Sequence, residues 1–145
     1  MDENIELLEY IYKSSEMGTL SCTKLIRDIN GKENKIKKVV ENILKEYESF
    51  QDESEKLINK NDYEIKENSM MTKMSSSMGV KMEVMKDNSD ANIAHLLTQG
   101  LTMGIVDVSS KIDNYKDEVD SKILKLAKKY LKFQQETVEE LKEYL

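Results

Sequence analysis

Proline is absent from this chain of 145 residues, and only five glycines interrupt it. Proline breaks a helix outright, and glycine is the next most unfavourable residue inside one. A chain with so few helix breakers can sustain long helices, and its length is enough for one buried core. The sequence therefore predicts an all-α protein with a single domain over residues 1–145.

Hydrophobic residues recur at helical spacing in four long segments, which predicts helices over residues 4–29, 34–60, 90–114 and 117–144. Asn30-Gly31 marks the end of the first segment, because glycine readily takes the left-handed conformation that closes a helix. Ser89 or Asp90 can cap the third helix. A further short helix is predicted over residues 70–86, either as a separate element or as the start of the third helix.

The links between these helices differ in length. The first two helices and the last two are joined by few residues, so each pair should form an antiparallel hairpin. About 30 residues separate the second helix from the third, which is long for a compact domain. One long central link is typical of the crossover in ferritin-like bundles. On these helix and link lengths the chain resembles a small bacterial ferritin-like four-helix bundle, over nearly its whole length.

The resemblance implies where metal ligands would lie. Ferritin-like di-iron proteins carry a Glu on two helices and Glu-x-x-His on each of the other two. This chain has no Glu-x-x-His, since its one histidine, His95, lies three positions after Asn92. His95 also points away from the apolar face, toward solvent. Levels along the helices leave four weak candidate ligands: Glu16, Glu46, Gln99 and Gln134. No cofactor is expected, with iron or manganese as the open alternative, because iron prefers carboxylate and imidazole ligands.

Six of the nine methionines lie between Met70 and Met85. Five of them step by four, four, four and three residues, so they share one side of a short helix. Thioether sulfur is a soft ligand for copper(I), but no histidine or cysteine accompanies it here. We interpret the segment as a crossover helix that packs adaptable side chains over the bundle. A partner-binding groove and a metal site are the alternatives.

Several polar residues fall on or beside the predicted inward faces. A buried polar group needs a hydrogen-bond partner. The sequence therefore predicts a buried network that comprises Tyr12, Tyr47, Asp107, Tyr130 and Gln134. Its simplest role is to fix the register of the helices; a remnant ligand sphere or a small-ligand cavity is the alternative.

Two further features are interpreted as packing. Gly100-x-x-x-Gly104 should let the third helix approach a neighbour closely. Cys22 falls on a buried stripe, where an inert thiol is expected.

The charge balance limits the partners. The net charge is −6, which disfavours nucleic acid and anionic membrane surfaces, because both bind through clustered lysine and arginine. The N-terminal sequence MDENIELLEY lacks the basic start and apolar run of a signal peptide. No apolar run approaches the roughly 18 residues needed to span a bilayer. A cytoplasmic location is expected.

Catalytic and nucleotide-binding signatures are absent, so the leading hypothesis is a non-enzymatic ferritin-like bundle that acts through protein contacts, as a homodimer. Apolar residues outside the four stripes should supply its surface: Leu7, Leu25, Leu124, Leu131 and Val138. One alternative is an unorthodox metal-binding, redox or storage protein. Another is a module that uses the Met-rich segment to bind an amphipathic helix in a groove.

Overall fold

The computed structural model describes residues 2–64 and 87–145 of the chain. Over these ranges it contains no strand, and its helices are α1 (Glu3–Asp28), α2 (Lys37–Lys60), α4 (Asp90–Tyr115), α5 (Ser121–Leu141) and the 3₁₀ turn η1 (Lys142–Tyr144). The prediction of an all-helical chain with four long helices is confirmed for this part. The predicted starts of α2 and α5, at residues 34 and 117, were a few residues early, and the predicted end of α5, at residue 144, includes the turn η1. The predicted helix over residues 70–86, with its methionines, lies outside the described residues.

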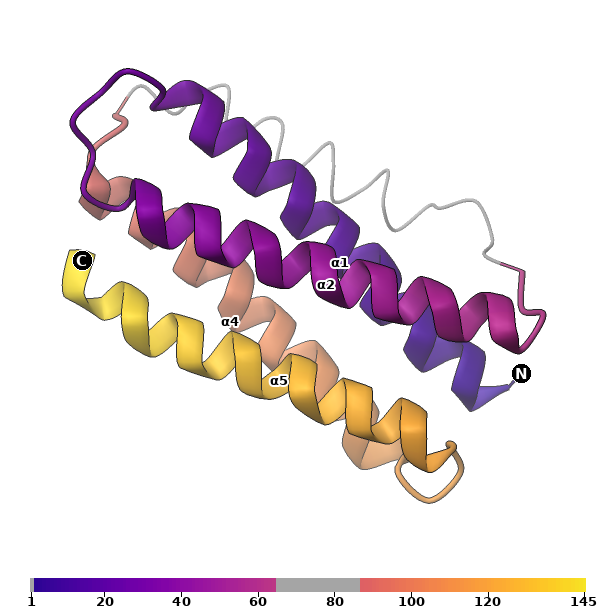
Figure 1. The fold of residues 1–145 in the computed structure, drawn as a ribbon. Coiled ribbons are helices and arrows are strands. Elements are labelled where there is room, and N and C mark those ends of the chain that lie inside the picture. Colours follow the sequence, from indigo (N-terminus) through magenta and orange to yellow (C-terminus); the bar gives the residue numbers. More distant parts are fainter. Residues whose placement is uncertain (1, 65–86) are drawn as a thin grey trace.

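The four helices form two antiparallel hairpins, α1 with α2 and α4 with α5 (Figure 1). At one end of the bundle Tyr63 Oη donates to Asp2 Oδ2 at 3.1 Å, and the Asp120 amide donates to Asn4 Oδ1 at 2.8 Å. The N-termini of α2 and α4 meet at the other end, where Asp90 contacts the start of α2. Helices α2 and α4 therefore run in the same direction, and α2 ends at the opposite end of the bundle from the start of α4.

The helix ends show how local sequence positions these elements. Asp2 caps α1 by accepting the Asn4 amide at 2.9 Å, and Ser89 caps α4 by accepting the Asn92 amide at 3.3 Å. Gly31 has φ of +80° just after α1, as predicted for the residue that ends this helix. Each device satisfies backbone groups that a helix end leaves without partners.

Helix α2 has no cap from its own N-terminal residue. Asp90, on α4, holds the turn that leads into α2, accepting the Lys35 amide at 3.1 Å and the Ile36 amide at 3.4 Å. The same carboxylate accepts the Asn34 side-chain amide at 2.9 Å. One carboxylate therefore lies at the N-termini of two helices, where the helix dipoles favour negative charge.

The core runs along the whole bundle, and α1 contacts α2, α5 and α4. Because it has neighbours on several sides, α1 buries more of its circumference than one stripe. Leu7 and Leu25 are fully buried, so the prediction that they supply surface for self-association is wrong. Leu124, Leu131 and Val138 are partly buried against the core.

Candidate functional site

The four candidate metal ligands lie in different environments. Glu46 and Gln99 are exposed, Glu16 is half-buried, and Gln134 is 1% exposed. Among residues 2–64 and 87–145, no three His, Cys, Asp or Glu side chains gather as a metal site would need. His95 is exposed, as predicted. Two ligands that face solvent and one in the core do not form the common inward-facing set that the resemblance implied.

A polar contact in the middle of the bundle joins α1 to α5. Ser14 Oγ and Tyr130 Oη lie 2.6 Å apart. Burial raises the pKa of the Tyr130 hydroxyl above its ordinary value, and the Ser14 hydroxyl partly offsets this effect. Tyr130 is the largest of the fully buried side chains. A buried hydroxyl with one close partner is satisfied, so this contact fixes the position of α5 along α1.

Tyr10 lies one helical turn before Ser14 and extends this polar region toward α4. Burial raises the pKa of its hydroxyl, and the negative charge of Asp107 on α4 raises it further. The Lys111 ammonium lies 5.3 Å from the centroid of the Tyr10 ring, within the range of a cation–π contact. Residues of three helices therefore act on one another here, with the tyrosines held in their neutral form.

The structure keeps part of the predicted polar network and changes the rest. Tyr47, Tyr130 and Gln134 are buried, as their inward positions predicted. Tyr12 is only half-buried, because it lies beside Glu16 and Glu55 at the outer side of the α1–α2 contact. Asp107 is exposed at the bundle surface rather than buried, although its charge still acts on Tyr10.

Sequence reasoning missed Tyr10 and Ser14. These residues are four apart, so they share a helix face, which is the signal that could have found them. The predicted network named Tyr12 instead, which lies two positions after Tyr10 and therefore on a different face of α1.

Gln134 is held in the core by a glycine. A Cβ on Gly104 would lie 2.2 Å from Gln134 Nε2, so only glycine lets the amide lie against α4. Within the described part of the chain, Gln134 Oε1 has no hydrogen-bond partner. Gly100 has open space around it. The predicted close approach through Gly100-x-x-x-Gly104 therefore holds at its second glycine only.

Aromatic rings fill the space between α2 and α5. The Tyr47 and Phe133 centroids are 5.1 Å apart, and the Phe50 and Tyr130 centroids are 5.0 Å apart, both edge to face. Such pairs stabilise a core beyond the area they bury. The rings separate the two helices and form the base on which any surface feature between them rests.

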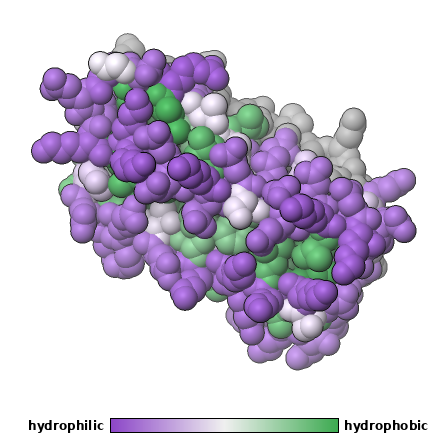
Figure 2. Space-filling model, in the orientation of Figure 1, coloured by the Kyte–Doolittle hydropathy of each residue, from purple (hydrophilic) through white to green (hydrophobic). Residues whose placement is uncertain are grey.

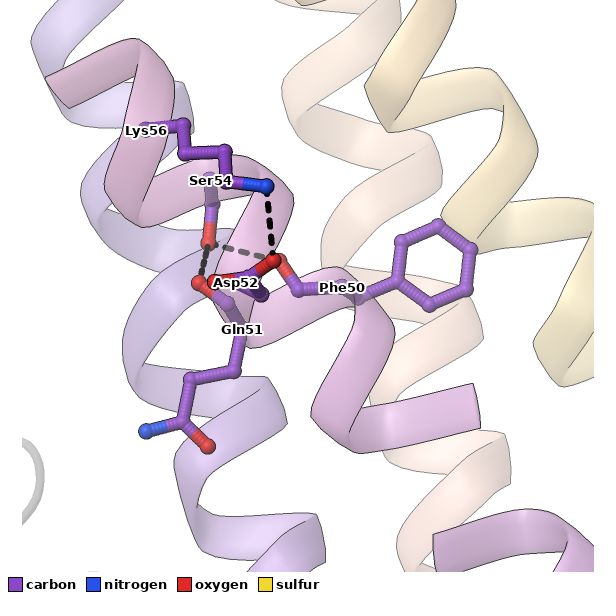
Figure 3. Close-up of polar contacts among 5 residues, drawn as sticks. All are labelled: Phe50, Gln51, Asp52, Ser54 and Lys56. Carbon is purple, nitrogen blue, oxygen red and sulfur yellow. Dashed lines mark hydrogen bonds and ion pairs between the residues drawn. The ribbon is translucent and has the colours of Figure 1, made fainter. Parts of the chain in front are cut away.

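Figure 3 shows how α2 presents its two sides at this level. The Phe50 ring points toward α5, while Asp52 and Lys56 form an ion pair of 3.0 Å away from it. Ser54 is fully buried, yet its hydroxyl donates to the carbonyls of Phe50 at 2.7 Å and Gln51 at 3.0 Å. Because its polar group is satisfied within its own helix, Ser54 can pack in the core without a partner from another helix.

Above these rings lies a groove of about 630 Å³ between α2 and α5, called here the α2–α5 groove. Figure 2 shows hydrophobic side chains between the hydrophilic rows of these two helices. Its floor comprises Ile43, Phe50, Phe133 and Thr137. Its rim carries three lysines and three glutamates, namely Lys45, Glu46, Lys129, Lys132, Glu136 and Glu140. Apolar groups surrounded by balanced charge are typical of a protein-binding surface.

Cys22 is fully buried, and burial raises the pKa of its thiol to about 12. A thiol that stays protonated is a poor nucleophile. This placement agrees with the prediction of a core residue.

No protein-family model, curated protein or solved structure matches this chain. Over the described ranges, none of the helices combines the length and the apolar character that crossing a membrane requires.

Proposed function

We propose that this protein acts through protein contacts made at the α2–α5 groove, as a non-enzymatic helical bundle in the cytoplasm. The observation that carries the proposal is the groove itself, with its apolar floor and its rim of three lysines and three glutamates. Apolar groups at the floor of a groove supply affinity at the centre, and a charged rim supplies orientation at the edge.

We further propose that the bundle is ferritin-like and of bacterial type, with residues 61–89 acting as its crossover, and that it forms a homodimer. The directions of the four helices support the first part, because α2 ends at the opposite end of the bundle from the start of α4 (Figure 1). The balanced rim supports the second part. A two-fold interface uses the same patch on both subunits, so that patch must carry both signs of charge.

Sedimentation velocity of the purified chain, from micromolar to millimolar concentration, tests the proposal. Asn42 is exposed and lines the groove, so Asn42→Trp should obstruct it and weaken the association. Asn59→Trp places the same side chain at an exposed position of α2 outside the groove lining and is the matched control. Equal association of both variants and the wild type would contradict a role for the groove.

The same groove favours a second candidate function, in which the occupant is an amphipathic helix of another protein. A wild-type chain that stays monomeric at all concentrations would point to this alternative. The metal-binding alternative has no comparable support, because Glu46 and Gln99 face solvent while Gln134 is in the core. Elemental analysis after growth with added iron or manganese tests it, and roughly two metals per chain would restore it.

A further inference from the structure

The exposed face of α5 and η1 is divided by charge. Its first half carries five exposed lysines and its second half four exposed glutamates. Lys122, at the start of α5, has no counterpart in the second half; the other eight are Lys125, Lys128, Lys129, Lys132, Glu136, Glu139, Glu140 and Glu143. We call this set of eight the α5 charged face. It adjoins the α2–α5 groove, since Lys129, Lys132, Glu136 and Glu140 belong to both.

The two halves are arranged symmetrically about Gln134. Lys132 and Glu136 lie two residues before and after it, and the other pairs lie five, six and nine residues away: Lys129 with Glu139, Lys128 with Glu140, and Lys125 with Glu143. At roughly 100° per residue, all eight lie within about 60° of the direction opposite Gln134. Because Gln134 is buried against Gly104, that direction faces solvent.

A two-fold axis at the level of Gln134, perpendicular to α5, would exchange these halves. Such an axis reverses the helix, so a position before Gln134 in one copy lies opposite the equally distant position after it in the other. It leaves the sideways offset unchanged, so the pairs nearest the centre of the face, Lys125 with Glu143 and Lys132 with Glu136, lie most directly opposite each other. The lysine half of one copy then faces the glutamate half of the other.

We propose that the partner at the α5 charged face is a second copy of this chain, bound antiparallel along α5 across that axis. The proposal rests on the proposed function, and it names the orientation in which the two grooves meet. A helix face whose lysine half complements its own glutamate half is self-complementary, as an isologous interface requires.

The charges are poorly paired within one copy. Lys132 lies 3.8 Å from Glu136, and Lys129 lies 3.8 Å from Glu53, both at exposed positions. Glu139 pairs with Lys142 at 2.7 Å, also on the surface. Among the described residues, Lys125, Lys128, Glu140 and Glu143 have no ion-pair partner within 4.0 Å. The face therefore has charge available for a partner.

A second hollow supports the same occupant. It has a volume of about 380 Å³ and lies beside Leu124, with four lysines around it: Lys125, Lys128, Lys129 and Lys132. Like charges so close repel one another, and a row of glutamates from a second copy would relieve the repulsion. A polyanion would engage the lysine half only, because the glutamates on the same face would repel it.

Exposed ion pairs contribute little affinity individually, but together they set orientation and partner choice. The charged face should therefore decide how two copies meet, while the adjoining groove floor supplies apolar contact. High salt should weaken the dimer, because exposed charges are screened.

Charge reversal tests this orientation. One variant changes four lysines to glutamate (K125E, K128E, K129E and K132E), and another changes four glutamates to lysine (E136K, E139K, E140K and E143K). Each alone places like charges opposite one another, and its homodimer should dissociate at least about tenfold more readily. An equimolar mixture of the two should form a heterodimer, and the chain with all eight changes should dimerise again.

The control variant changes Lys32, Lys35, Lys38 and Lys116 to glutamate. It lowers the net charge by as much as the α5 lysine-to-glutamate variant does, but at exposed positions away from α5. It should dimerise almost as the wild type does. Both α5 variants should fold, because acids near the start of a helix and bases near its end suit the helix dipole. Circular dichroism melting checks this before sedimentation.

Two outcomes would overturn the inference. If the charge variants dimerise like the wild type while Asn42→Trp does not, the antiparallel arrangement is wrong and the groove remains the contact surface. If the wild-type chain is monomeric at every concentration, both this inference and the proposed homodimer fail, and the groove is left to another protein.

Discussion

Helix α2 packs against α1 on one side and against α5 on another, and the two contacts are built differently. At the α1–α2 contact, Gly18 lies so close to Tyr47 that an added Cβ would sit 2.5 Å from the ring. Aromatic rings, including Phe50 and Phe133, line the α2–α5 contact. The first contact is the most extensive in the described part of the bundle, and the second leaves a groove.

We infer from the comparison that small residues bring helices close together, whereas large rings hold them apart. Ser15 and Ser54 are buried, and their hydroxyls donate to carbonyls of their own helices, such as Ile11 O at 2.6 Å and Phe50 O at 2.7 Å. Small self-satisfied residues let helices approach closely. Large rings fill the core but separate the backbones, so the surface above them is hollow.

The largest expected effect is at the α2–α5 contact. Phe50→Ala removes a ring that contacts both Tyr130 and Phe133, and we expect a loss of about 3–5 kcal/mol in the free energy of unfolding. Urea unfolding measures it. Glu48→Ala, at an exposed position on the same helix, should change stability by less than about 0.5 kcal/mol. Similar values for the two variants would show that the rings do not support this contact.

Alkaline pH should weaken the α1–α2 contact. Burial raises the pKa of Cys22 from 9.0 to about 12 and raises that of Tyr47 well above 10.0. Between pH 9 and about 12, the Cys22 thiol loses its proton in the unfolded chain but keeps it in the folded chain. Stability should therefore fall as pH rises from 9, by up to roughly 1.4 kcal/mol per pH unit for one such group.

Urea unfolding at a series of pH values from neutral to strongly alkaline measures this dependence. Cys22→Ala removes the contribution of the thiol, so its stability should fall less steeply just above pH 9. Identical slopes for the variant and the wild type would contradict a buried, protonated thiol.

Gly18→Ala tests how tight the first contact is. The added methyl group must displace the buried Tyr47 ring, so we expect a loss of about 1–3 kcal/mol despite the better helix propensity of alanine. Gly100→Ala is the matched control, because nothing lies within 4 Å of its Cβ position. That control should gain about 1 kcal/mol. A gain at both glycines would remove the distinction between the two contacts.

The smallest expected effect is at the end of the bundle where α2 and α4 begin. Asp90→Ala removes the carboxylate that accepts the Lys35 and Ile36 amides just before α2, at a cost of about 1 kcal/mol in thermal or urea unfolding. Ser89→Ala removes the cap of α4 and provides a comparison of similar size. If Asp90→Ala had no effect, the contact between the two hairpins at this end would contribute nothing to stability.

Much of this architecture could be predicted from the sequence, because helix periodicity and the scarcity of breakers are local properties. The four helices and the buried positions of Tyr47, Tyr130 and Gln134 follow from them. The buried face of α1 could not be predicted as one stripe, since α1 packs against three other helices. Leu7 and Leu25 consequently belong to the core.

The candidate site was harder to predict than the fold. A groove depends on which rings from α2 and α5 meet, and helix spacing does not reveal that pairing. Tyr10 was missed because its partners, Ser14 and Asp107, include one from another helix. The reversed order of charges in α5, in contrast, is present in the sequence alone, but only the structure shows that its face is exposed.

The carboxylate of Asp90 also has a consequence for the order of folding. It closes the start of α2 from a position 54 residues further along the chain, and Asn4 joins Asp120 across 116 residues at the other end. Contacts between distant residues require long loops to close, whereas each hairpin can form from contacts between residues that are closer in the sequence. We therefore expect the two hairpins to form first and the contacts between them at the ends of the bundle to form last. The amides of Lys35 and Ile36 should then be among the first to exchange with solvent when the bundle opens.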